Sequence, residues 1–276
     1  MKKRRVFKLS SVGIFLLILL ICLVSVGPYI YMVVVSLKTK NLVYRPDVWF
    51  FKPTFENYIA AFKKSNLGIY MLHSGIIAIG NCVVSLVLGS SVAYALARFS
   101  FKSKEKVAFY MVFIRTLPAV VCVIPLYVLA SIFKILDTHG LLISVYLLFN
   151  LPYTVLMMRG FFEDIPYEVE EAAMIDGCTR LQMLCRVVIP LSRPGLVATA
   201  IFCMINAWNE FVYAALLTTF KVSTVPTIVQ LYKSVSGIVW GEMAATGTIA
   251  TLPAIIFAVI VQKQMVRGLS FGAVKG

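Results

Sequence analysis

The chain contains one cluster of hydrogen-bonding and aromatic side chains inside a run of apolar residues. Its members are Asn206, Trp208, Asn209, Glu210 and Tyr213. On a continuous helix Asn206 and Glu210 are four residues apart and share a face, with Asn209 beside them. Amides and carboxylates supply donors and acceptors for a hydroxyl-rich ligand, and the rings of Trp208 or Tyr213 offer a stacking surface. The cluster therefore predicts either a polar route through the protein or a hydrogen-bond clamp between helices.

No enzyme motif accompanies this cluster. The sequence has no GxxxxGK(S/T) phosphate loop, no GxSxG, no HExxH and no carboxylate pair on a plausible scaffold. Its six cysteines form no CxxC pair, and His73 and His139 are isolated from one another in the sequence. We therefore predict a protein that is no enzyme by itself and that carries neither a metal nor a cofactor.

The composition indicates an integral membrane protein. The chain has 276 residues, of which 60% are hydrophobic, and its mean hydropathy is +0.90. In a soluble protein the net charge of +14 would suggest binding to nucleic acid. Here the Lys and Arg residues lie at the ends of apolar runs, which is typical of membrane topology signals, so we predict no nucleic-acid partner.

Six apolar runs are each about as long as the hydrocarbon core of a bilayer requires. They predict an all-α, multi-pass membrane protein with spanning helices at approximately 11–37, 72–97, 107–133, 141–159, 194–217 and 244–265. Lys and Arg number 16 in the segments on the side of the N-terminus and 9 on the other side. Because cytoplasmic segments carry the excess of positive charge, both termini and the loop 161–193 are predicted to be cytoplasmic.

Individual residues add detail to two of these runs. Gly89, Ala93 and Ala97 recur every four residues and predict a helix face that a neighbouring helix approaches closely. Arg115 lies inside the third run, where its charge either faces the interior of the bundle or reaches back to the lipid headgroups. Pro118 follows it and predicts a kink.

The first outer loop mixes prolines, aromatic residues and charges. It predicts a short amphipathic helix at 57–63 that lies at the membrane interface. Trp49, Phe50 and Phe51 indicate either an aromatic belt at the level of the headgroups or a surface for an extracellular partner.

The polar segment between the fourth and fifth runs is built differently from the other loops. Pro166 is placed at the start of a helix whose first turn is acidic, and Gly177 stands where that helix needs a residue with positive φ. Thr179 and Gln182 have the spacing of a capping box for a second helix, which Pro190 is predicted to stop. Two short helices with a glycine corner between membrane spans indicate a docking element.

This segment contains, in order, Glu171-Ala172-Ala173, Asp176-Gly177 and Ile189-Pro190. In spacing and in position before the penultimate span, these residues resemble the EAA signature of ABC importer permeases. Further stretches resemble the carbohydrate permeases of the maltose-transporter type: PTFENY at 53–58, Arg115 with Pro118, WNEF at 208–211 and RGLSFGAVKG at 267–276. The resemblance covers essentially the whole chain and departs from the family at Cys178, where alanine is more common.

The resemblance implies a type I ABC importer permease (MetI-like) fold and a set of partners. A second homologous permease, two cytoplasmic ATPase subunits and an extracellular sugar-binding protein would complete the transporter, with a sugar as substrate and membrane lipid around it. Small alanines would let the helix seat in an ATPase cleft, and acidic residues would pair with basic groups there. The residues implied in coupling are Glu170, Glu171, Ala172, Ala173, Asp176, Gly177 and Pro190.

This interpretation divides the chain into an N-terminal region of residues 1–71, a core 72–265 that includes the coupling loop 161–193, and a cytoplasmic tail 266–276 that would also reach the ATPase. It places the protein in the cell membrane of a prokaryote, with the polar cluster of the fifth run along the route of the sugar. A self-sufficient carrier or channel that uses Arg115 and Glu210 for ion coupling is the alternative from another class. Within the family, a permease for amino acids or peptides is the nearest alternative.

Overall fold

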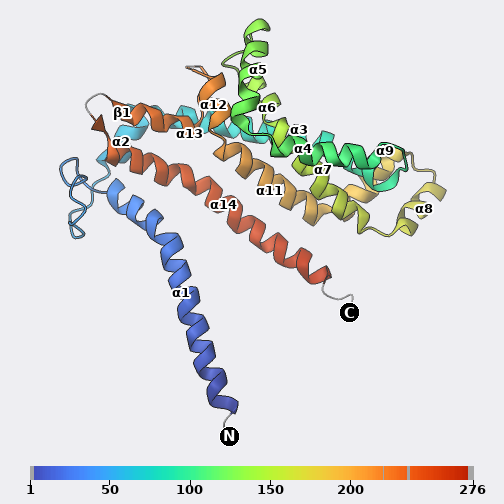
Figure 1. Cartoon of the computed structure of the whole chain (residues 1–276), viewed down its shortest axis with the longest axis horizontal. Helices are drawn as coiled ribbons and strands as arrows, with labels where there is room; N and C mark the ends of the chain where they lie inside the picture. Colours follow the sequence, from blue (N-terminus) through green and yellow to red (C-terminus); the bar gives the residue numbers. More distant parts are fainter. Residues whose placement is uncertain (1–2, 220, 235–236, 273–276) are drawn as a thin grey trace. The chain divides into compact units, whose positions relative to one another are not determined.

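The computed structural model describes residues 3–219, 221–234 and 237–272, and it is mostly helical, as predicted (Figure 1). The described residues belong to two units, Met1–Leu67 with Val229–Thr251 and Gly68–Ile228 with Leu252–Gly276. The elements are α1 (Lys3–Ser36), α2 (Glu56–Lys63), α3 (Leu67–Arg98), α4 (Lys104–Thr116), α5 (Ala119–Ile132), α6 (His139–Val145), α7 (Leu147–Glu163), α8 (Tyr167–Ile175), α9 (Arg180–Met183), the π-helical turn η1 (Leu184–Val188), α10 (Ile189–Leu191), α11 (Arg193–Asn209), α12 (Val212–Leu217), α13 (Val225–Ile228), the 3-10 turn η2 (Val229–Tyr232), the two-stranded β1 (Lys233–Ser234) and β2 (Gly237–Ile238), and α14 (Trp240–Gly272).

Three helices of the described chain are long and apolar enough to cross a membrane by themselves: Val12–Ser36 of α1, all of α3, and Trp240–Ile260 of α14. Three helix pairs pass the same test only together, and each pair is bent: α4 with α5 by 94°, α6 with α7 by 45°, and Arg180–Leu191 with α11 by 85°. Counted as one span each, these pairs bring the number to six, which is the number predicted. The last pair differs from the predicted span 194–217, because it includes Arg180–Leu191 from the predicted cytoplasmic loop and lacks α12. The expected tail 266–276 continues α14 as far as Gly272, and its last four residues lie outside the described ranges.

The third predicted span is not a continuous helix. The two residues between α4 and α5, Leu117 and Pro118, are extended, with ψ of 128° and 132°. Proline lacks an amide hydrogen and disfavours the helical conformation of the residue before it, so the helix stops here. The kink expected at Pro118 is confirmed, but the span at 107–133 is corrected to two helices. Pro125 lies inside α5 and does not interrupt it.

In the first unit, the short helix α2 closes the end of α1. Asn57 is buried, and its amide nitrogen donates to the carbonyls of Ser36 (2.9 Å) and Lys38 (2.7 Å). These bonds satisfy carbonyl groups that the C-terminus of a helix leaves free. A Cβ on Gly241, at the start of α14, would lie 2.5 Å from Asn57 Oδ1, so glycine permits this close packing. The short helix predicted in the outer loop is confirmed as α2.

In the second unit, α7 is the helix on which its neighbours pack. Helices α4 and α11 lie against it, and α12 packs on α5 and α6. Helix α3 touches α7 at Gly89, where a Cβ would be 2.5 Å from Thr154 Cγ2. The small-residue face predicted for α3 is therefore confirmed at Gly89, and Ala93 one turn later is fully buried. Helix α8 lies far along the unit from α5 and α12 (Figure 1), and the two candidate sites lie at these separate places.

Two histidines that are isolated in the sequence meet in this unit. The rings of His73 and His139 pack edge to face with their centroids 4.9 Å apart. No group of three His, Cys, Asp or Glu side chains that could hold a metal ion is found within the described ranges.

Candidate functional site

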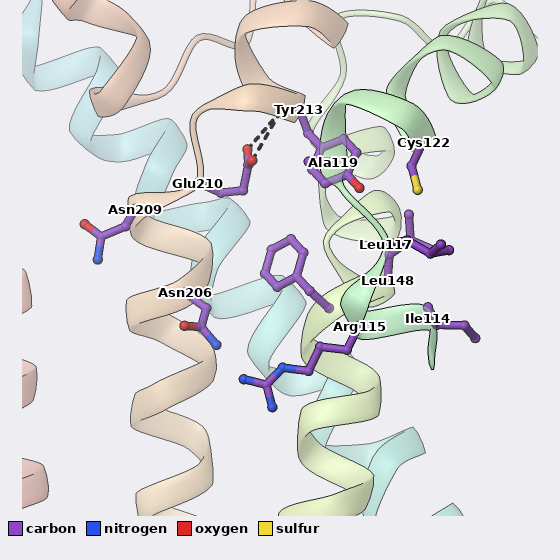
Figure 2. Close-up of a pocket in the computed structure, with 11 residues that line it drawn as sticks. Ile114, Arg115, Leu117, Ala119, Cys122, Leu148, Asn206, Asn209, Glu210 and Tyr213 are labelled. Atoms are coloured by element: carbon purple, nitrogen blue, oxygen red, sulfur yellow. Dashed lines mark hydrogen bonds between the residues drawn. The ribbon is translucent and has the colours of Figure 1, made fainter. Parts of the chain in front are cut away.

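The second unit contains a cavity of about 370 Å³ between α4, α5, α7, α11 and α12 (Figure 2). Apolar and aromatic side chains such as Phe149 form part of its wall. Its polar lining consists of Arg115, Asn206, Asn209, Glu210 and Tyr213. Four of the five residues singled out in the fifth apolar run therefore surround one cavity, whereas Trp208 is buried outside its lining.

Arg115 brings a positive charge to the wall of this cavity. It lies in the last turn of α4, and its guanidinium is placed over the ring of Tyr153 from α7, 5.0 Å from the ring centroid. Among the ion pairs of the described residues, none involves Arg115. Its side chain points from α4 toward Asn206 on α11 (Figure 2). Arg115 is exposed in the subunit, and its guanidinium faces the cavity, where the ring contact offsets part of the cost of the charge.

Glu210 does not share a helical face with Asn206, contrary to expectation. Helix α11 ends one residue earlier, and Glu210 is extended with ψ of 126°. Its carboxylate accepts hydrogen bonds of 3.0 to 3.3 Å from the backbone N–H groups of Val212, Tyr213 and Ala214. These N–H groups begin a helix and have no partner within it, so the carboxylate caps α12 and interrupts the predicted span. The carboxylate of Glu210 is therefore occupied by backbone donors.

The two asparagines of the cluster, Asn206 and Asn209, differ in burial and in direction. Asn206 is partly buried, and its amide nitrogen donates to Oδ1 of Asn150 on α7 at 3.2 Å. Asn209 is exposed and points away from Arg115 (Figure 2). Asn206 is thus the amide that the protein holds in a defined orientation at the cavity wall.

The second candidate site is α8, whose inner face is bound to the rest of the unit. Glu170 is fully buried, and its carboxylate accepts hydrogen bonds from Arg98 Nε (2.5 Å) and from the hydroxyl of Tyr94 (2.9 Å). Arg98 Nη2 also donates to the carbonyls of Phe162 (2.7 Å) and Ile165 (2.8 Å). This corrects the expectation that Glu170 faces an ATPase, because a buried carboxylate requires a compensating charge and finds it in Arg98.

The other face of α8 is open. Its exposed residues include Glu171, Ala172, Ile175 and Asp176. Ile175 is 86% exposed, which is unusual for a large apolar side chain beside a carboxylate. Ala173 packs inward against the core below α8. Of the residues implied in coupling, Glu171, Ala172 and Asp176 therefore lie on the open face, and Glu170 and Ala173 lie on the closed one.

Gly177 forms the corner after α8. Its φ is +83°, and no atom lies within 4 Å of where a Cβ would stand. The N–H groups of Gly177 and Cys178 each donate to a carbonyl of α8 at 3.0 Å, which completes a Schellman motif. Thr179 and Gln182 then form the predicted capping box at the start of α9. The glycine corner and the cap predicted from the sequence are both confirmed.

Pro190 does not end the second helix, contrary to expectation. The helix widens into the π-helical turn η1 and then includes the exposed Pro190 within α10. A wider turn accommodates a residue that has no amide hydrogen to donate. The chain bends by 85° only at Ser192, before α11 begins.

Comparison with known proteins identifies the chain. The model of a family described as binding-protein-dependent transport system inner membrane component matches residues 85–271, a range that includes α8 and the helices around the cavity. The chain belongs to this family of permeases. The family predicted from the EAA-like residues is confirmed, and with it a location in the membrane and a role as a transporter component rather than an enzyme.

This permease is similar to two characterised relatives over most of its length. It is 34% identical over 252 residues to the sulfoquinovosyl glycerol transport system permease protein SmoH of Agrobacterium fabrum, covering 90% of this chain and 88% of that protein. It is 33% identical over 262 residues to the trehalose/maltose transport system permease protein MalG of Thermococcus litoralis, covering 94% of each.

The fold of the permease is also found in a solved structure. A chain in the crystal structure of a bacterial ABC transporter involved in the import of the acidic polysaccharide alginate superposes with a TM-score of 0.78 at 23% identity. The similarity covers 95% of this permease and 98% of that chain. The MetI-like fold predicted from the resemblance is thereby confirmed.

Several residues of the two sites do not stand out in the sequence of the permease. Arg98 and Tyr94 stand at the end of a predicted span, where a terminal basic residue ordinarily indicates topology. Ile175 gives no signal because a single apolar residue in a polar loop is common. Asn81 in the run 72–97 and Asn150 near the start of α7 are the available signals, since an amide inside an apolar run requires a partner.

Proposed function

We propose that this permease is the transmembrane subunit of an ATP-driven importer for a sugar or an oligosaccharide. It works with a second, homologous permease, two ATPase subunits and an extracellular sugar-binding protein. ATP binding and hydrolysis in the partner subunits switch the permease between access to the outer side and access to the cytoplasm, where α8 and both termini lie.

The single observation that carries the ATP-driven part is the two-faced α8. Its open face presents the apolar Ile175 between the carboxylates of Glu171 and Asp176, a combination that supports docking in a cleft with a basic rim. Its closed face is fixed by the ion pair of Glu170 with Arg98. A displacement of α8 is therefore passed to the helices instead of being absorbed by a flexible loop.

The cavity supports a carbohydrate as cargo. Hydroxyl groups need donors and acceptors, which Arg115 and Asn206 supply, and the apolar face of a sugar ring packs on aromatic side chains such as Tyr213 and Phe149. The transport systems of the two relatives, for sulfoquinovosyl glycerol and for trehalose and maltose, favour a sugar over an amino acid or a peptide. We assign Asn206, Asn209 and Tyr213 to the route of the sugar and Glu210 to the frame of the cavity.

Reconstitution tests this proposal. The permease is purified in complex with its second permease and ATPase subunits, placed in proteoliposomes, and supplied with the cognate binding protein and radiolabelled maltose or trehalose. Uptake is expected only when ATP and the binding protein are both present. The matched control is the same complex with ATPase subunits that cannot hydrolyse ATP.

Two outcomes would contradict the proposal in different ways. Uptake by this permease alone, without ATPase subunits, would indicate a self-sufficient carrier. ATP-dependent uptake of an amino acid or a peptide in place of either sugar would retain the importer and reject the carbohydrate.

A further inference from the structure

Three asparagines from three helices form a line of side-chain hydrogen bonds that ends at the cavity. Asn81 of α3 and Asn150 of α7 are fully buried, and Asn206 of α11 lines the cavity. Asn150 Nδ2 donates to Asn81 Oδ1 at 2.7 Å, and Asn206 Nδ2 donates to Asn150 Oδ1 at 3.2 Å. These three residues are called the asparagine relay below.

Two backbone carbonyls fix the direction of the asparagine relay. Asn81 Nδ2 donates to the carbonyl of Ile143 at 2.8 Å, and Asn150 Nδ2 also donates to the carbonyl of Cys203 at 3.0 Å. A carbonyl oxygen only accepts, so each amide turns its nitrogen toward these carbonyls and its oxygen toward the next asparagine. Reversing a buried amide would set oxygen against oxygen and leave polar groups unpaired, which is unfavourable in the interior. The nitrogen of Asn206 is thereby committed to Asn150.

We infer that Asn81 and Asn150 are positioning residues, which hold Asn206 so that its amide oxygen is the hydrogen-bond acceptor left for a hydroxyl group of the cargo. The inference rests on the proposed function, because it names the chemistry that the cavity recognises. Arg115 projects toward Asn206 from the other side of the cavity and has donors only (Figure 2).

The side chains of Asn206 and Arg115 together select among the chemical groups that a cargo can present. A hydroxyl group donates to the oxygen of Asn206 and accepts from Arg115 at the same time. An ammonium group is repelled by Arg115, and a carboxylate, although attracted by Arg115, has no hydrogen to donate to the oxygen of Asn206. A site built to bind a hydroxyl rejects groups that leave its polar atoms unpaired, so the asparagine relay contributes to specificity for neutral polyols.

The test compares near-isosteric variants in the reconstituted complex. Asn206→Asp retains an acceptor at the cavity but removes the donor to Asn150, whereas Asn206→Leu removes both. Asn150→Leu leaves the cavity lining unchanged but removes the partner that orients Asn206. Thr199→Val is the matched control, because Thr199 is equally buried, lies on α11 and makes no hydrogen bond to the relay through its hydroxyl.

The measured quantity is the amount of labelled maltose or trehalose imported per ATP hydrolysed, with saturating loaded binding protein. Asn206→Asp keeps an acceptor but loses the bond to Asn150 that orients it, so its ratio is expected to fall several-fold below the wild type. Asn206→Leu, which also loses the acceptor, is expected about tenfold lower still, which corresponds to one lost hydrogen bond. Asn150→Leu is expected to fall several-fold, while Thr199→Val stays near the wild type. Equal ratios for Asn206→Asp and Asn206→Leu would overturn the inference, and this pair decides the question even if Asn150→Leu does not assemble.

A sugar-free measurement separates failure of the inference from failure of the proposed function. At neutral pH the carboxylate introduced by Asn206→Asp would face the oxygen of Asn150, and at low pH its protonated form would donate to that oxygen. The melting temperature of Asn206→Asp is therefore expected to rise relative to the Asn206→Leu variant as the pH falls. Arg115 and Glu210 are the charged groups that line the same cavity, so the comparison is made in an Arg115→Gln background with Glu210 unchanged. A pH-independent difference would overturn the inward orientation, whatever the cargo.

Discussion

The buried pair of Glu170 and Arg98 allows a sharp test of how α8 is attached. Glu170→Gln retains the size of the side chain and removes its charge. Arg98, whose side chain is only 9% exposed, then keeps the carbonyls of Phe162 and Ile165 but loses its counter-charge. Breaking one side of a buried ion pair costs about 3–5 kcal/mol. If this energy opens α8 locally, the detached population rises by a factor of roughly 150 to 5,000.

Hydrogen exchange in the assembled complex measures this opening directly. Amides of α8 are expected to exchange much faster in Glu170→Gln, since the helix is released from α3 and from the turn that precedes it. ATP hydrolysis is expected to continue while sugar uptake falls, because a detached α8 no longer moves the membrane helices. For Arg98→Lys, both the exchange rate of α8 and the sugar uptake are expected to lie between those of the wild type and those of Glu170→Gln. The ammonium of lysine retains the charge but cannot reproduce the planar contacts of the guanidinium.

Glu171→Gln is the matched control, one residue away and chemically identical. Glu171 lies on the open face of α8, so its loss should leave the exchange of α8 unchanged and weaken the association with the ATPase subunits. The reasoning is refuted if Glu170→Gln leaves both exchange and uptake at wild-type values. The reasoning is equally refuted if Glu170→Gln and Glu171→Gln change exchange and uptake by the same amount. The closed face and the open face of α8 would then contribute equally to its attachment.

Three further predictions concern the frame of the two sites. Gly177→Val should destabilise by about 1–2 kcal/mol through backbone strain alone, because open space surrounds the position, and Gly177→Asn should recover most of the loss in thermal melts. Gly89→Ala should cost about 1–3 kcal/mol because its Cβ meets Cγ2 and Cβ of Thr154. Thr154→Ser removes only Cγ2, so it should rescue part of the loss in a double-mutant cycle; purely additive losses would contradict the contact. Glu210→Ala should lower stability by about 0.5–2 kcal/mol through the lost cap of α12, with a smaller effect for Glu210→Gln; loss of uptake at an unchanged melting temperature would instead indicate a direct role with the cargo.

The features of this permease that were predictable depend on neighbours in the sequence. The apolar runs, the capping box of Thr179 and the positive φ at Gly177 each follow from a few adjacent residues. The small-residue face at Gly89 follows from a four-residue repeat. Such signals are local, and the fold expresses them wherever tertiary contacts do not oppose them.

The features that were missed depend on residues far apart in the chain. Glu170 and Arg98 are separated by 72 positions, and nothing near Glu170 indicates that it turns inward. The break after α11 has a different cause, because it is local. Apolar composition favours a continuous span through Glu210, but its carboxylate competes for the N–H groups of the next turn and starts a new helix.

The two sites are connected by two helices that are joined at three levels. Asn81 of α3 is bonded to Asn150 of α7, Gly89 packs on Thr154, and Arg98 donates to the carbonyl of Phe162. From Asn81 to Arg98 the helix α3 rises about 26 Å, so these contacts fasten the pair along most of a bilayer thickness.

We expect the joined helices α3 and α7 to have a different mechanical role from the interrupted spans α4–α5 and α11–α12. Helix α8 follows α7 directly and is anchored to α3, so we expect its displacement to carry α3 and α7 as one body. Asn206 is bonded to Asn150, which places one wall of the cavity on that body. The opposite parts, α5 and α12, are attached through the extended residues at Pro118 and Glu210. We expect these extended residues to act as hinges, so that α5 and α12 would reorient around the cargo when α8 moves.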